Sequence, residues 1–197
     1  AMVFKMSGVT PPPKGKEYVG WLISDDWSFK KNTGAMQVQD GGTISHTFAS
    51  SSESYTGADL IAIYSKLVIT QEDLGADPAA STGQPAFIYE VPLGAMTHIR
   101  HLMSAFPTGA QEGILTNLRT QLRTALFHSG FAIAANTLAG AMQHSEHVVN
   151  IIEGPGGLNY GDLDGNELTE DPGDGVGVLK HIDDSKHAVF AARQAPG

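Results

Sequence analysis

The hydrophobic pattern of this chain changes character at Val91-Pro92, and this change restricts the possible folds more than any other feature. Before it, short segments rich in alternating or β-branched apolar residues are separated by turn residues such as Asp40-Gly41-Gly42. Such segments predict β-strands, and their close spacing predicts an antiparallel β-sandwich or barrel-like sheet. The expected strands cover residues 18–24, 35–39, 43–48, 60–64, 66–72 and 86–90.

Beyond Val91-Pro92, apolar residues recur at helical spacing. One helix is expected from about Gln111, and a second is expected to begin after Thr137 as its N-cap and to end in the glycine-rich segment 154–157. The first helix would bury a face formed by Leu115, Leu118, Leu122, Leu126 and Ile133. The sequence therefore predicts an α+β protein with a linker over 1–16, a β-sandwich domain over 17–92 and a helical hairpin or bundle domain over 93–197.

Composition excludes several kinds of partner and cofactor. The chain has 197 residues, a formal charge of −9 and only 12 Lys and Arg, which argues against nucleic acid or an anionic membrane surface as a partner. It contains no cysteine, so disulfides, thiolate metal sites and covalent c-type haem are excluded. The sequence contains no run of eighteen apolar residues, the length that a helix needs to span a bilayer. Abundant Gly, Ser, Thr and Asp with scarce Lys favour an extracellular, periplasmic or cell-envelope location.

An acidic loop follows the second expected helix, over residues 159–174. Counted from Asp162, it places oxygen-bearing groups at alternating positions, and a hard cation such as calcium needs several such oxygens at about 2.3–2.6 Å. The expected calcium ligands are Asp162, Asp164, Asn166, the carbonyl of Leu168, Glu170 and Asp174. The loop resembles dockerin and EF-hand calcium loops, but Glu167 occupies the position of the usual turn glycine and Gly173 that of the closing glutamate. The alternative is a solvated turn without an ion.

Histidines are the second unusual feature, since the chain has eight. His98 and His101 are three residues apart, as are His144 and His147, so each pair lies on one side of a helix where both imidazoles can reach one metal ion. Methionines 96, 103 and 142 lie near these pairs in sequence, and thioether with imidazole suits copper or haem iron. His144 is the strongest single candidate, because Ala141, Val148 and Ile151 share its expected buried face. The alternative is a set of histidines on solvated helix faces.

Parts of the first half resemble a known family. These parts are residues 18–22, Thr33-Gly34, Asp40-Gly41-Gly42, the strand 67–72 and the turns 75–78 and 81–85. Together they resemble the extracytoplasmic domain of anti-sigma-K-type factors over residues 17–90. The resemblance implies a small β-sandwich outside the cytoplasmic membrane. It does not imply sigma-factor regulation, because this sequence shows neither a sigma-binding segment nor a transmembrane helix.

The sequence favours a binding or structural role over catalysis. No Gly-x-Ser-x-Gly elbow and no nucleotide-binding glycine pattern occurs. The leading hypothesis is a non-enzymatic extracellular or cell-envelope module that calcium stabilises, with metal ions, another envelope protein or a second copy as partners. The alternative is a haem or copper protein that transfers electrons or senses a ligand through its helix histidines.

Overall fold

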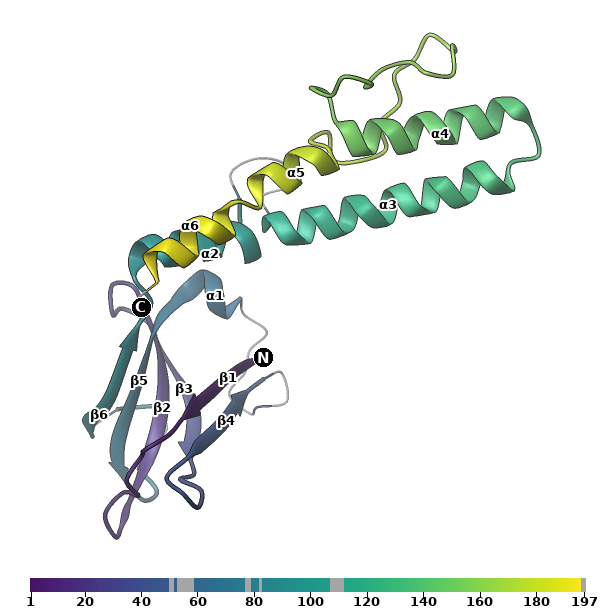
Figure 1. The fold of residues 1–197 in the computed structure, drawn as a ribbon. Coiled ribbons are helices and arrows are strands. Elements are labelled where there is room, and N and C mark those ends of the chain that lie inside the picture. The colour runs from purple at the N-terminus through teal and green to yellow at the C-terminus, as the bar shows by residue number, and fades with distance from the viewer. Residues whose placement is uncertain (50–51, 53–58, 77–78, 82, 107–111, 196–197) are drawn as a thin grey trace. The chain divides into compact units, whose positions relative to one another are not determined.

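The computed structural model describes residues 1–49, 52, 59–76, 79–81, 83–106 and 112–195. The chain forms two compact units, a β unit over Ala1–Leu93 and a helical unit over Gly94–Gly197, and each is described by itself (Figure 1). The predicted α+β class is confirmed, with antiparallel sheets preceding helices. The division falls beside Val91-Pro92, where the hydrophobic period changes from that of a strand to that of a helix.

Two antiparallel sheets make up the β unit. The smaller pairs β1 (Met2–Met6) with β4 (Ile44–Phe48). The larger has the order β3-β2-β5-β6, formed by β2 (Lys16–Ser24), β3 (Lys30–Met36), β5 (Tyr64–Asp73) and β6 (Gln84–Glu90). Phe4, Ile44 and Phe48 of the smaller sheet pack against Leu22 and Ile69 of the larger. Burial of these side chains holds the two sheets face to face.

Three local expectations in this unit were wrong. Residues 1–16, expected as a linker, contain β1, which pairs with β4 over its full length. The expected hairpin 35–39 with 43–48 is reduced to one bridge between Gln39 and Thr43, because β4 pairs with β1 instead. Residues 60–64, expected as a strand, form the short helix α1 (Leu60–Ile63), whose first turn is capped by the carboxylate of Asp59.

The helical unit contains α2 (Leu93–Met103), α3 (Ile114–Ala134), α4 (Leu138–Glu153), α5 (Val178–Asp184) and α6 (His187–Gln194). The antiparallel helices α3 and α4 lie side by side in Figure 1. Thr137 caps α4 by accepting a hydrogen bond from the amide of Gly140, and Gly154 ends the helix with a φ of 71°. Among the described residues, no helix is long and apolar enough to cross a bilayer.

Four of the five residues of the expected apolar face of α3 are exposed, and the fifth, Leu118, packs against the core. Leu126 is 70% exposed and Ile133 is 88% exposed. The buried side chains are those of Ile114, Asn117, Gln121 and Ala125. The buried face includes polar residues because it contacts the acidic loop as well as a helix. Gln121 Oε1, for example, accepts a hydrogen bond from the amide of Asp174 at 3.1 Å. Apolar periodicity alone therefore selected the wrong side of the helix.

The apolar core of the helical unit is small. Within the described part of this unit, the buried cluster is formed by Ala125, Ile151 and Val178, with Leu118 and Ile152 packed against it. Small cores contribute little hydrophobic stabilisation, and chains with such cores commonly use metal ions or other cross-links as well. Contacts between polar groups of the helices are therefore expected to contribute to the stability of this unit.

Candidate metal centres

Two groups of three histidines lie in the helical unit, each built by two helices. The first, called the α3–α4 cluster, consists of His128 of α3 with His144 and His147 of α4. The second, called the α2–α6 cluster, consists of His98 and His101 of α2 with His187 of α6. In each group the candidate ligand nitrogens all lie within 4.8 Å of one another. The four predicted histidines thus fall into two separate sites, and each site has a third member.

The α3–α4 cluster centres on His128. Its Nδ1 lies 3.2 Å from Nδ1 of His144 and 3.0 Å from Nδ1 of His147. Phe131 packs beside the rings of His128 and His144, with centroid distances of 5.6 and 5.4 Å. His147 is buried, and the other two rings are half-buried. The site therefore has three converging nitrogens beside an apolar ring.

The α2–α6 cluster repeats this arrangement around His187. Its Nδ1 lies 2.7 Å from Nδ1 of His98 and 3.4 Å from Nδ1 of His101. Phe106 packs against His101 and His187, both at a centroid distance of 5.4 Å. Phe190 lies 5.3 Å from the ring of His98. Again two histidines one helical turn apart meet a third from another helix.

Hydrogen bonding alone does not satisfy either cluster. A neutral imidazole has at each nitrogen one in-plane position, which holds either a proton or a lone pair. Nδ1 of His128 faces two other Nδ1 atoms, and Nδ1 of His187 does the same. One such nitrogen can form a hydrogen bond with only one of its two neighbours. A cation at the centre can instead accept the lone pairs of all three nitrogens at once. A tetrahedral ion with metal–nitrogen bonds of 2.0–2.1 Å requires nitrogens about 3.3 Å apart, close to the observed spacing.

The surroundings lower the pKa of His128 in the first cluster and of His101 and His187 in the second. Burial lowers the pKa of His128, and the charges of His147 and His144 lower it further. Burial likewise lowers the pKa of His101, with His98 adding to the effect. A neutral ring is the form that binds a metal ion, so the lowered pKa values favour metal binding by His128, His101 and His187.

Acidification is expected to destabilise the metal-free chain. Because these pKa values are lowered in the folded state, the unfolded chain binds more protons below about pH 6.5, the ordinary histidine value. The free energy of unfolding should therefore be highest above this pH and should fall as the pH drops below it. Calorimetry of chelator-treated protein between about pH 7.5 and pH 5.5 should show a falling melting temperature. A melting temperature that stays constant or rises would contradict this prediction.

The acidic loop closes through side chains at alternating positions. Asp162 accepts hydrogen bonds from the amides of Gly165 and Glu167 at 2.7 and 2.9 Å. Asp164 accepts from the amide of Asn166 at 3.0 Å, and Asn166 accepts from that of Leu168 at 2.8 Å. These bonds turn the three side chains toward the inside of the loop. Glu167 has a φ of 69°, the left-handed conformation that a glycine usually supplies in a calcium loop.

Two buried residues of α4 hold this loop in place. Glu146 is 1% exposed, and its carboxylate accepts hydrogen bonds from the amides of Leu163, Asp164 and Glu170 at 2.7, 3.1 and 2.9 Å. Asn150, fully buried one turn later, accepts from the amide of Gly161 and donates to the carbonyls of Gly161 and Glu170. The loop is thus anchored to α4 by a carboxylate and an amide.

The expected calcium ligands do not all meet. Asp162 and Asp164 approach Glu146, and these three carboxylates form one group of converging oxygens. Asp174 instead pairs with the buried His181 at 2.7 Å and accepts a hydrogen bond from the amide of Val176. Of the other expected ligands, Glu170 accepts from Gln143, and Asn166 and Leu168 lie in the exposed part of the loop.

Sequence reasoning missed His128, His187 and Glu146 as site residues. Glu146 lies on the buried face of α4. One sequence signal could have identified Glu146. It forms a polar pair with Asn150, four residues later, on the helix that precedes the acidic loop. His128 continues the buried face of α3 that passes through Gln121 and Ala125, which polar residues obscured. No local sequence pattern indicated that His187 would lie beside His98 and His101.

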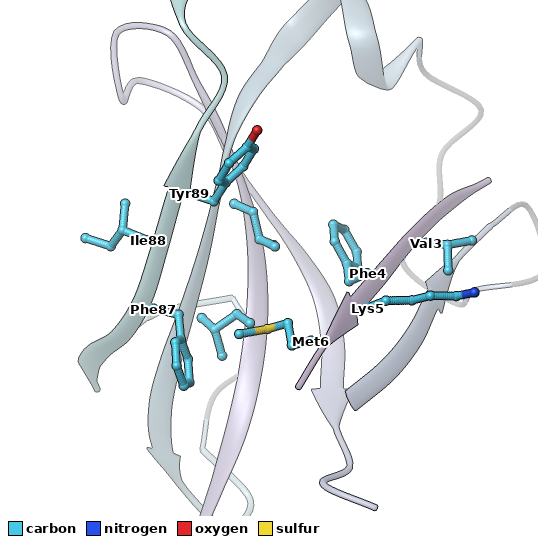
Figure 2. A pocket seen from close by; sticks show the side chains of 9 residues that line it. Val3, Phe4, Lys5, Met6, Phe87, Ile88 and Tyr89 are labelled. Atoms are coloured by element: carbon cyan, nitrogen blue, oxygen red, sulfur yellow. The ribbon is translucent and has the colours of Figure 1, made fainter. Parts of the chain in front are cut away.

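The β unit contains an apolar pocket of about 470 Å³ between β1 and β6. Figure 2 shows the side chains of Phe4, Met6, Phe87 and Tyr89 turned toward the space between these strands, whereas Lys5 points away. Leu67 and Ile69 of β5 also line it. The lining therefore extends the apolar core, and it lacks the converging polar groups that fix the orientation of a small ligand. The histidine clusters are the stronger candidates for a site.

Comparisons with protein-family models, with curated proteins and with solved structures found no match. The resemblance of residues 17–90 to the anti-sigma-K-type domain, the dockerin-like character of the acidic loop and the extracellular or cell-envelope location therefore stay predictions.

Proposed function

We propose that the helical unit is a metal-binding module in which the α3–α4 and α2–α6 clusters each hold one divalent transition-metal ion of the zinc or copper class. The observation that carries the proposal is the convergence of three Nδ1 atoms in each cluster. Imidazole ligands suit zinc, copper, iron and nickel. Three protein ligands leave a fourth position open to water or to a group from a partner.

A bare ion fits these clusters better than haem. Two axial histidines on a haem iron lie on opposite faces of the ring, with their nitrogens about 4 Å apart, twice a metal–nitrogen bond. The Nδ1 atoms of His98 and His187 are 2.7 Å apart, which leaves no room for a porphyrin between them. A third nitrogen from the same side has no place in such a site either. A blue-copper centre needs a cysteine, which this chain lacks.

The test is an absorption titration of the chelator-treated chain. Copper(II) should produce a weak visible band that saturates at two equivalents, since each cluster binds one ion. Added haemin should leave its absorption unchanged from that in buffer. A haemin spectrum converted to that of a bis-histidine haem, with no copper band, would reject the proposal in favour of a haem protein.

A second candidate is calcium in the acidic loop. It is supported by the inward-turned side chains of Asp162, Asp164 and Asn166 and by the left-handed conformation of Glu167. In this role calcium would fix the loop against α4 and stabilise the helical unit, as the leading sequence hypothesis holds. Glu146 would add a carboxylate that the sequence alone did not suggest.

Calcium is then expected to raise the melting temperature of the chain, because an ion that binds only the folded state stabilises it by mass action. The measurement compares millimolar calcium with a chelator. Asp162→Asn should abolish the rise, since it removes one charge from the converging oxygens. A melting temperature unchanged by calcium in the wild-type chain would remove the loop as a calcium site.

A further inference from the structure

Glu170 stands against the α3–α4 cluster on the far side of one of its rings. Its Oε2 lies 3.6 Å from Nε2 of His147, whereas Nδ1 of the same ring faces His128 at 3.0 Å. We propose that Glu170 is a positioning residue for the metal ion of this cluster. It keeps the proton of His147 on Nε2 and so directs the lone pair of Nδ1 at the ion. This inference rests on the function proposed above.

The α4 helix fixes Glu170 at three points. Gln143 donates to both carboxylate oxygens of Glu170, at 3.2 and 2.9 Å. Glu146 accepts from the backbone amide of Glu170 at 2.9 Å, and Asn150 donates to its carbonyl at 3.0 Å. With His147, these residues occupy one face of α4 at the helical spacing i, i+3, i+4, i+7. The same face therefore carries a metal-ligand candidate and the groups that place a carboxylate behind it.

Additional contacts keep the carboxylate in this position. Asn166 of the acidic loop donates to Glu170 Oε2 at 3.3 Å. The side chain of His147 is 11% exposed and that of Glu170 is 30% exposed, so water screens their interaction only in part. At 3.6 Å the two groups are at an ion-pair distance, slightly longer than a hydrogen bond. The acidic loop thus delivers one of its carboxylates to the histidine cluster.

A cation on Nδ1 makes this contact stronger. It draws electron density from the ring, so the proton on Nε2 becomes a better donor and the carboxylate stabilises the charge that the ring acquires. Carboxylates in this relation to a metal-bound histidine fix its tautomer and orientation, and their loss typically lowers metal affinity about 10- to 100-fold. The acidic loop therefore tunes the α3–α4 centre whether or not it holds an ion of its own.

The test compares Glu170→Gln with Glu167→Gln in the full chain. Both remove one negative charge from the same loop, but Glu167 is exposed on the loop surface. Each is placed in a His187→Ala background, which disables the α2–α6 cluster, and in a His128→Ala background, which disables the α3–α4 cluster. Zinc affinity is measured by competition with a chromophoric chelator, and the copper(II) electron paramagnetic resonance spectrum reports the ligand field.

In the His187→Ala background, Glu170→Gln should weaken zinc binding about 10- to 100-fold and change the copper spectrum. Glu167→Gln should change neither, and in the His128→Ala background both variants should bind zinc as their parent does. If both variants bind zinc alike in the His187→Ala background, the role of Glu170 is disproved while the metal site stands. If that background binds no zinc at all, the proposed metal site fails and this inference fails with it.

Discussion

Replacing Glu146 by alanine is expected to lower the free energy of unfolding of the helical unit by about 3–5 kcal/mol. Its carboxylate accepts hydrogen bonds from three backbone amides of the acidic loop. An unsatisfied buried donor costs about 1–3 kcal/mol, and the truncation leaves three of them without their acceptor. Part of this cost is recovered when the loop detaches and water reaches the amides. The expected loss is therefore smaller than three full penalties for unsatisfied donors. Denaturant unfolding measures the change, and hydrogen exchange should show protection lost across residues 161–170.

Glu153→Ala provides the matched control. Glu153 is also on α4, but among the described residues its carboxylate accepts a hydrogen bond from the exposed side chain of Asn159 and from no backbone amide of the acidic loop. Its removal should cost less than about 1 kcal/mol and leave hydrogen exchange of the loop unchanged. Equal effects of the two substitutions would show that Glu146 does not organise the loop.

The β-to-α succession was predictable from local pattern, while the pairing of strands was not. Strand and helix periods are properties of short segments, and the change at Val91-Pro92 lies next to the division between the two units. Pairing depends on residues far apart in sequence: β1 joins β4 through Phe4 opposite His46, a partnership that no local signal specifies. The expected linker 1–16 contains Pro11-Pro12-Pro13, and the short strand β1 precedes these prolines.

In the helical unit, the prediction failed where polar residues are buried. The exposed leucines of α3 were assigned to the core because apolar periodicity was the criterion. The face that is buried carries Asn117 and Gln121 and leads to His128. Polar residues become buried when they hold a loop or a metal ion, and such partners are invisible to a hydrophobic pattern. The spacing of His98 with His101, and of His144 with His147, pointed to two of the three histidines in each cluster.

Substituting one central histidine should remove one metal ion and leave the other. His128→Ala is expected to abolish binding at the α3–α4 cluster, because the two remaining histidines come from α4 alone. His187→Ala should do the same at the α2–α6 cluster, leaving only the two histidines of α2. With two ligands in place of three, affinity should fall at least about 100-fold at the altered site. Isothermal titration with zinc should show one strong equivalent for each single variant and none for the double variant.

His46→Gln is the control for these substitutions. His46 belongs to the β unit, where its Nε2 lies 2.8 Å from the carbonyl of Thr33, and it is in neither cluster. This variant should bind zinc with the wild-type stoichiometry. Loss of a zinc equivalent on changing His46, or retention of both on changing His128, would show that the ions bind elsewhere.

The most direct test of the metal-binding account is the zinc content of the wild-type chain at equilibrium. Chelator-treated protein is dialysed against micromolar zinc at about pH 7.5, above the ordinary pKa of histidine, and protein and metal are then quantified by elemental analysis. The account predicts two zinc ions per chain. A chain that retains no zinc under these conditions would contradict it.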